Sequence, residues 1–131
     1  MEKAVEILAL IHFLVMGVSH VVHRRAWAEF FIWLRGRGHA GVFVHGFLSL
    51  GFGSLIVAFH NVWTGLPAVL TAYGWLMIFK SLLCFVTPAV ALRSLQRVSL
   101  QRSWEFIPAG ILFLALAGVL AVVLLSGVHS A

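Results

Sequence analysis

Four long apolar segments divide this sequence, and their length constrains the fold more than any other feature. They cover residues 4–22, 39–61, 67–90 and 106–126. Each is close to the ~20 residues that a helix needs to cross ~30 Å of hydrocarbon. The pattern predicts an all-α integral membrane protein in which one membrane domain, residues 1–131, forms a bundle of four transmembrane helices.

The composition agrees with embedding in a membrane. Hydrophobic residues make up 62% of the chain and charged residues only 10%, whereas about 25% of the residues of a soluble domain are charged. The formal net charge of +5 comes mainly from two connections, with Arg24, Arg25, Arg35 and Arg37 in the first and Arg93, Arg97 and Arg102 in the second. These arginines flank predicted spans and form no separate basic face, so the expected partner is the lipid bilayer and not a nucleic acid.

The positions of the arginines also predict an orientation. Connections rich in lysine and arginine stay on the cytoplasmic side of a membrane. The connection at residues 62–66 carries no charge, and the tail after Ser126 has only His129. We therefore expect a multi-pass protein with both arginine-rich connections in the cytoplasm and both termini outside.

Two shorter amphipathic stretches lie in the arginine-rich connections. At residues 26–35 the apolar side chains share one helical face and Glu29 lies on another. A second stretch follows Pro88, with Ala91, Leu92, Leu95 and Val98 on one side and Arg93 and Arg97 on the other. Both predict helices lying in the cytoplasmic interface. The expected interfacial anchors are Trp27, Phe30, Phe31, Leu34, Trp63 and Trp104.

The chain also indicates a duplication of a helical hairpin, with halves 1–62 and 63–131. An alignment of the two halves that pairs Met16 with Lys80 also pairs Val22 with Val86. It pairs apolar positions of the first amphipathic stretch with those of the second. If the halves share descent, they run parallel and are related by an axis along the membrane normal.

A family resemblance rests on residues near the ends of two spans. The run Val-His-Arg-Arg-Ala-Trp at residues 22–27, and Lys80-Ser81-Leu82-Leu83 followed by Thr87-Pro88, resemble a pattern in the small two-span YjeT-like inner-membrane proteins of bacteria. Each half would correspond to one such protein. Arg24 stands where that family has a proline, and Lys80 stands where an acid is common. The resemblance implies a hairpin unit of a bacterial inner membrane and no particular activity.

Polar residues inside the spans form stripes at helical spacing. Such side chains are costly in hydrocarbon, so they usually face the interior of a bundle. The candidate polar residues are His12, Met16, Ser19, His20, His45, Ser49, Tyr73, Lys80 and Ser81. We expect the stripes of the first three spans to face a common region, in which Lys80 can approach His12, Tyr73 or Ser19.

Small residues predict close helix contacts, because they let helix backbones approach each other. The fourth span has no charged side chain after Glu105, and several of its small residues fall on one side. The expected packing residues are Gly46, Gly53, Gly110, Ala117 and Ala121. They serve contacts either within the bundle or with another subunit.

These patterns leave several functions open. No phosphate-binding loop, nucleophile elbow or paired carboxylates occur, and Cys84 is the only cysteine, so neither an enzyme nor a bound cofactor is predicted. The leading expectation is a non-catalytic accessory or interaction subunit that associates with itself or with other membrane proteins. One alternative is a redox subunit that binds haem b or quinone, with His20 and His45 as axial haem ligands at similar depth. Another is a small proton, ion or solute transporter with His12 and Lys80 on its pathway. No metal site is predicted, because no helix pairs two histidines at i,i+4 with an acidic third ligand.

Overall fold

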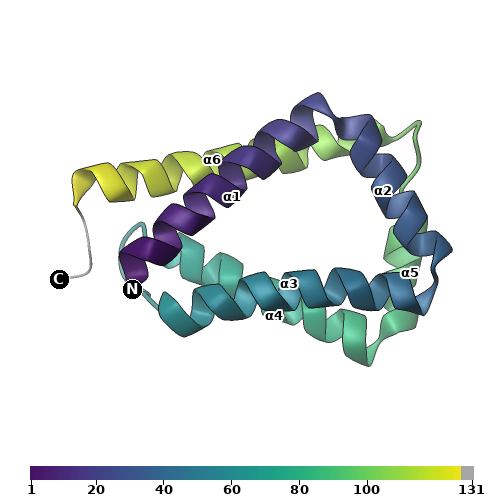
Figure 1. Ribbon diagram of the computed structural model, residues 1–131, viewed down its shortest axis with the longest axis horizontal. Helices are drawn as coiled ribbons and strands as arrows, with labels where there is room; N and C mark the ends of the chain where they lie inside the picture. The colour runs from purple at the N-terminus through teal and green to yellow at the C-terminus, as the bar shows by residue number, and fades with distance from the viewer. Residues whose placement is uncertain (128–131) are drawn as a thin grey trace.

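A computed structural model describes residues 1–127, which contain six α-helices, one short 3-10 turn and no strand (Figure 1). The predicted all-α class is therefore confirmed for this part of the chain. The elements are α1 (Glu2–Val22), α2 (Arg24–Gly36), α3 (His39–Phe59), α4 (Ala68–Val86), α5 (Pro88–Gln96), η1 (Ser103–Glu105) and α6 (Phe106–Ser126). Four of the helices, α1, α3, α4 and α6 with its η1 extension, are long and apolar enough to cross a membrane.

The helix boundaries follow from local chemistry. The predicted third span ends at Val86, because Thr87 has non-helical backbone angles and Pro88 opens α5 in its first turn. A residue before proline is disfavoured in the helical region, whereas proline at the first helical position costs little. Both amphipathic stretches form helices, α2 and α5, although Val98 lies beyond the end of α5.

The turn between α2 and α3 depends on glycine. Gly38 has a φ of 59°, a backbone conformation that side chains other than hydrogen disfavour. At Gly41, an added Cβ would lie 1.8 Å from the carbonyl oxygen of Leu34. The start of α3 can therefore pass directly against the end of α2 only because residue 41 has no side chain.

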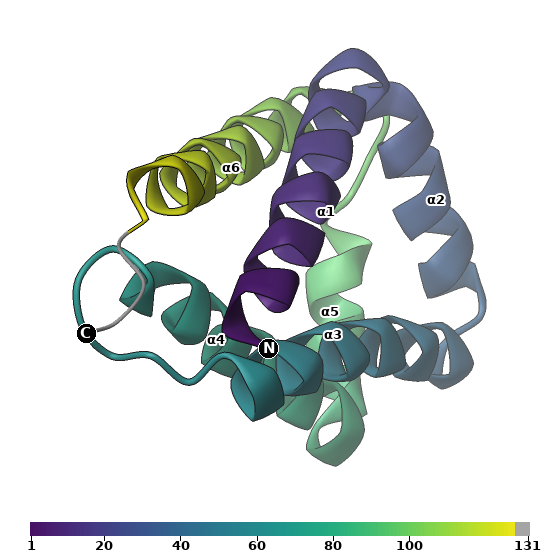
Figure 2. The same cartoon turned by 60° about the vertical axis from the view of Figure 1, so that its left-hand side comes forward.

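The four long helices form two antiparallel pairs, α1 with α6 and α3 with α4, which each pack along their length (Figures 1 and 2). The pairs approach each other at the end that carries the amino terminus, here called the narrow end. They diverge toward the other end, here called the wide end, where α2 and α5 lie between them (Figure 1). The first long helix of each proposed half thus packs on the last long helix of the other half, which is the arrangement that a two-fold axis between the halves would produce.

Apolar side chains fill the bundle in two clusters. The larger one joins all four long helices and consists of Val5, Ala9, Phe13, Ile56, Leu70, Ala117 and Leu120. The smaller one, at the wide end, consists of Val42, Cys84 and Leu95 and is flanked by Phe31, Ala91 and Leu92. Side chains of α3 and α4 therefore contribute to both clusters.

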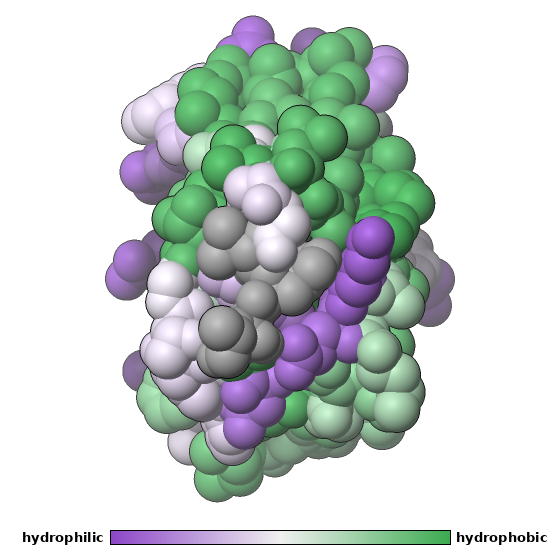
Figure 3. Space-filling model, turned by 90° about the vertical axis from the view of Figure 1, so that its left-hand side faces the viewer, coloured by the Kyte–Doolittle hydropathy of each residue, from purple (hydrophilic) through white to green (hydrophobic). Residues whose placement is uncertain are grey.

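The exterior of the long helices is also apolar. Fully outward-facing large side chains include Ile11, Val15, Phe47, Leu48, Leu76, Phe79, Ile111, Leu112 and Val122, all more than half exposed. Figure 3 looks at the narrow end, where hydrophilic side chains gather beside extensive apolar surface. Such a contiguous apolar exterior is unusual for a water-soluble monomer and suits a hydrocarbon environment.

Candidate functional site

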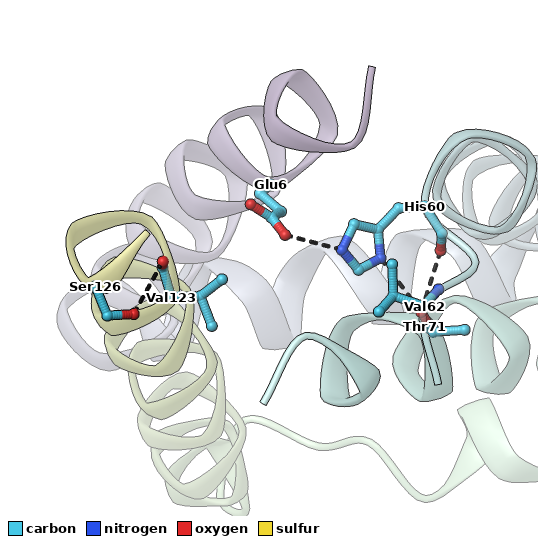
Figure 4. Close-up of polar contacts among 6 residues, drawn as sticks. All are labelled: Glu6, His60, Val62, Thr71, Val123 and Ser126. Atoms are coloured by element: carbon cyan, nitrogen blue, oxygen red, sulfur yellow. Dashed lines mark hydrogen bonds and ion pairs between the residues drawn. The ribbon is translucent and has the colours of Figure 1, made fainter. Parts of the chain in front are cut away.

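A buried polar cluster joins three elements at the narrow end (Figure 4). Glu6 comes from the first turns of α1, His60 directly follows α3, and Thr71 lies in the first turn of α4. The Nε2 atom of His60 lies 3.0 Å from Oε1 of Glu6, and its Nδ1 atom lies 3.2 Å from Oγ1 of Thr71. The side chains of His60 and Glu6 are 0% and 2% exposed. The cluster therefore connects α1 with the α3–α4 pair away from water.

The hydrogen bonds of Thr71 determine where the protons of this cluster lie. The hydroxyl group of Thr71 donates a hydrogen bond to the carbonyl oxygen of His60 at 3.1 Å, which uses its only proton. The same hydroxyl oxygen accepts a hydrogen bond from the backbone N–H of Val62 at 3.0 Å. The Nδ1 atom of His60 must then donate to Thr71. The hydrogen bond between Nε2 of His60 and Oε1 of Glu6 therefore contains one proton. The pair is either an imidazolium with a carboxylate or a neutral imidazole that accepts a hydrogen bond from a carboxylic acid.

This cluster also satisfies backbone groups where the chain leaves α3. The carbonyl group of His60 and the N–H of Val62 are buried and outside any helix, and such groups are costly without a partner. The Thr71 hydroxyl serves both. Chemically, the arrangement holds a proton and fixes the contact between the helix pairs at the narrow end.

Glu6, His60 and Thr71 are not among the candidate polar residues that the sequence predicts. A signal was present, because Glu6 is the only carboxylate inside the four predicted segments. An acid in a span calls for a partner within the bundle. In the alignment of the two halves that pairs Met16 with Lys80, Glu6 is paired with Leu70. The second half therefore has no acid at this position.

A second candidate site is a pocket of about 270 Å³ near the wide end, between α3, α4 and α5. Lys80 and His45 line it together with Cys84, and most of the remaining wall is apolar. The complete lining is Val42, His45, Lys80, Leu83, Cys84, Val90, Ala91, Ser94 and Leu95. The structure thus brings two predicted polar residues of neighbouring spans into one basic pocket, here called the Lys80 pocket.

The polar stripe of α1 does not join this pocket. The imidazole of His12 stacks on Phe52 with ring centroids 4.1 Å apart, and Oγ of Ser19 accepts a hydrogen bond from Nε1 of Trp27 at 2.9 Å. Tyr73 meets the edge of Phe13, with centroids 4.8 Å apart. His12, Ser19 and Tyr73 do not line the Lys80 pocket, so a polar region shared by all three spans stays a prediction.

Two of the remaining polar candidates, Ser81 and His20, lie against backbone carbonyl groups of their own helices. The Oγ atom of Ser81 donates to the carbonyl oxygen of Ile78 at 2.6 Å, within α4. The backbone carbonyl group of Met16 is 2.7 Å from Nδ1 of His20, one turn along α1. Ser49 is buried on α3. These residues are consistent with helix packing and point to no further site.

The two histidines considered as haem ligands each pack against an aromatic side chain of α2. The ring of His20 stacks on Trp27 with centroids 4.1 Å apart, and the ring of His45 meets Phe31 at 5.4 Å. Among residues 1–127, no group of three or more His, Cys, Asp or Glu side chains is arranged to hold a metal ion.

Most of the predicted packing residues lie at contacts within the chain. A Cβ on Gly46 would lie 2.9 Å from Cβ of Cys84, on Gly53 2.8 Å from the carbonyl oxygen of Gly74, and on Gly110 2.8 Å from that of Gly17. Ala117 is buried in the larger apolar cluster, and Ala121 is half-buried on α6. Gly17 and Gly74 were not predicted, although each faces a predicted glycine across its helix pair.

The predicted anchors divide between the inside and the outside of the fold. Leu34 is completely buried, and Trp27 and Phe31 are half-buried against the bundle. Phe30, Trp63 and Trp104 face outward, with Trp63 60% and Trp104 54% exposed. The apolar face of α2 thus packs mainly on the protein.

Comparisons of the chain with protein-family models, with curated proteins and with solved structures returned no match. Its function must therefore be inferred from its own residues and contacts.

Proposed function

We propose that this chain is a non-catalytic accessory protein of a bacterial inner membrane, which acts by contacting lipids and other membrane proteins. The proposal rests on which faces of the long helices make contacts within the chain and which faces point outward. The glycine faces of the long helices are used inside the monomer, and large apolar side chains cover their exterior. Outside the four long helices the described chain has only α2, α5 and short connections, which leaves little material for a soluble catalytic or sensory site.

The charge distribution supports the proposed orientation. All of the arginines lie in the connections at the wide end, whereas the narrow end carries Glu2 and Lys3. By the positive-inside bias, this distribution favours α2 and α5 at the cytoplasmic surface and the amino terminus outside. His129 and the rest of the carboxyl-terminal tail, also expected outside, fall beyond the described residues. The bacterial location rests on the resemblance to YjeT-like proteins.

The use of glycines within the chain limits how a partner can bind. Contacts through Gly46, Gly53 or Gly110 would require the helix pairs to open, because these positions already meet α4 or α1. An interaction subunit with this fold would instead offer its outward apolar faces to a second copy or to a different membrane protein.

Insertion and orientation can be tested with single cysteines in a Cys84→Ser background. An impermeant thiol reagent should label Trp63→Cys in intact cells, and it should label Arg97→Cys only after the inner membrane is permeabilised. Both positions are exposed in the fold, so failure to label cannot be ascribed to burial in the protein. Labelling of both sites from the same side would contradict the four-span topology.

The accessory role can be tested on protein purified gently from its native membrane, by non-denaturing mass spectrometry and an absorption spectrum. We expect stoichiometric copies of this chain or of another membrane protein and a colourless sample. A Soret band that disappears on His45→Ala would establish the redox alternative. Flux into liposomes that falls on Lys80→Met would establish the transport alternative.

A further inference from the structure

The Lys80 pocket contains a positive charge without a carboxylate nearby. The chain has four acidic residues, Glu2, Glu6, Glu29 and Glu105. Glu6 pairs with His60, Glu29 with Arg25 and Glu105 with Arg102, while Glu2 begins α1 at the opposite end of the bundle. Withdrawing an ammonium group from water is costly, and a nearby anion offsets that cost. Within the described residues no carboxylate is placed to balance Lys80, so an anion from outside the chain would fill this role.

The pocket lies just inside the expected boundary between headgroups and hydrocarbon, on the wide-end side of these spans. Lys80 and His45 each lie six residues from the wide-end terminus of their helix, which is about 9 Å at 1.5 Å per residue. The amphipathic helix α5 forms the third wall and contributes the hydroxyl group of Ser94. Lys80 and His45 therefore lie at one level, and with Ser94 in the same pocket wall they form a donor set suited to a phosphate group.

The pocket opens sideways between α4 and α5. Leu83 and Val90 line it, yet they are 41% and 57% exposed on the exterior of the protein. An acyl chain can therefore lie over these two side chains in the hydrocarbon while its head enters the pocket. Basic pockets between transmembrane helices on the cytoplasmic side are known sites for the headgroups of anionic lipids.

We propose that the Lys80 pocket binds the singly charged phosphodiester of an anionic phospholipid, with Lys80 as its counter-charge and the acyl chain over Leu83 and Val90. This inference rests on the membrane insertion proposed above. A zwitterionic lipid carries the same phosphate, but its own ammonium group competes with Lys80. The site should therefore favour a phospholipid whose headgroup has no cation.

The test is the thermal stability of the full chain in a neutral detergent, with phosphatidylglycerol, phosphatidylcholine or oleate added to the micelles. At lipid about a hundredfold above its Kd, we expect phosphatidylglycerol to raise Tm by about 5–10 °C. Phosphatidylcholine and oleate should give much smaller shifts. An equal shift with phosphatidylcholine would overturn the role of net charge, and a larger shift with oleate would overturn the phosphodiester assignment.

Three variants separate the pocket from the general attraction of arginines to anionic lipid. Lys80→Met keeps most of the length of the side chain and removes its charge, so the lipid-dependent shift should disappear. Val90→Trp obstructs the mouth of the pocket from an exposed position and should reduce the shift with Lys80 intact. Arg93→Met removes an exposed cation from the same helix and should leave the shift unchanged. A shift that persists in Lys80→Met, or that disappears only in Arg93→Met, would refute the proposal.

The labelling experiment with single cysteines decides membrane insertion without reference to lipid binding. A protein that inserts with the expected topology and shows no preference for phosphatidylglycerol would refute this inference alone. A protein that does not insert would refute the proposed function.

Discussion

Replacing Gly53 by alanine tests how closely α3 and α4 approach each other. The new Cβ would lie 2.8 Å from the carbonyl oxygen of Gly74 and from Cβ of Met77, and 3.0 Å from the backbone nitrogen of Ile78. Two of these three atoms belong to the backbone, so no side-chain rotation relieves the contact. The helices must separate locally, and overpacking of this kind typically costs about 1–3 kcal/mol.

Gly51 provides a matched control on the same helix. A Cβ at Gly51 meets nothing within 4 Å, so Gly51→Ala adds only the gain in helix propensity, about 0.5–1 kcal/mol. Gly53→Ala brings the same stabilising gain in helix propensity. The difference in free energy of unfolding between the two variants therefore isolates the overpacking and should be about 1–3 kcal/mol, with Gly53→Ala the less stable.

The assay is reversible unfolding in mixed micelles, followed by circular dichroism as the fraction of denaturing detergent increases. The mass of the native particle, measured by light scattering, should be the same for both variants because the contact lies within one chain. Equal stability of Gly51→Ala and Gly53→Ala would refute the proposed packing. A loss of oligomer mass specific to Gly53→Ala would indicate that this face serves an interface between subunits.

Three further substitutions test the polar contacts by the same unfolding measurement. Glu6→Ala removes one partner of a buried pair and should destabilise the fold by about 3–5 kcal/mol, whereas Glu29→Ala breaks an exposed pair and should cost less than about 1 kcal/mol; similar losses would contradict the burial argument. Thr71→Val keeps the side-chain shape but leaves buried backbone groups without their partner, so it should cost about 1–3 kcal/mol per group, while Thr87→Val at an exposed site should have little effect. Arg35→Ala removes the guanidinium group that donates to the carbonyl oxygens of residues 96 and 98, at 3.1 and 2.5 Å, and should increase amide hydrogen exchange at the end of α5; unchanged exchange would show that these bonds do not fix that segment.

The candidate sites illustrate what a single sequence can and cannot predict. His45 and Lys80 were identified because ionisable side chains in spans are conspicuous, but their shared pocket depends on how α5 folds back against α3 and α4. Glu6 and His60 are far apart in the chain, and their contact requires the first turns of α1 to meet the end of α3. Spacing along one helix contains no information about which distant residue lies opposite.

The small residues show the same limit. Gly53 was predicted to pack closely, but whether its neighbour would be α4 or another subunit was open. Its contact with Gly74 places it inside the monomer.

The helical elements can be recognised from the amino-acid sequence alone. The lengths of the apolar segments, the position of Pro88 and the amphipathic patterns of α2 and α5 act locally, so they can be read without knowledge of distant contacts. The pairing of α1 with α6 and of α3 with α4 became known only from the folded chain. The same is true of the internal position of the glycine faces and of the two polar sites at opposite ends. In hydrocarbon an apolar helix face gains little by choosing one apolar neighbour over another, so pairing depends on close packing and hydrogen bonds that form only when particular helices meet.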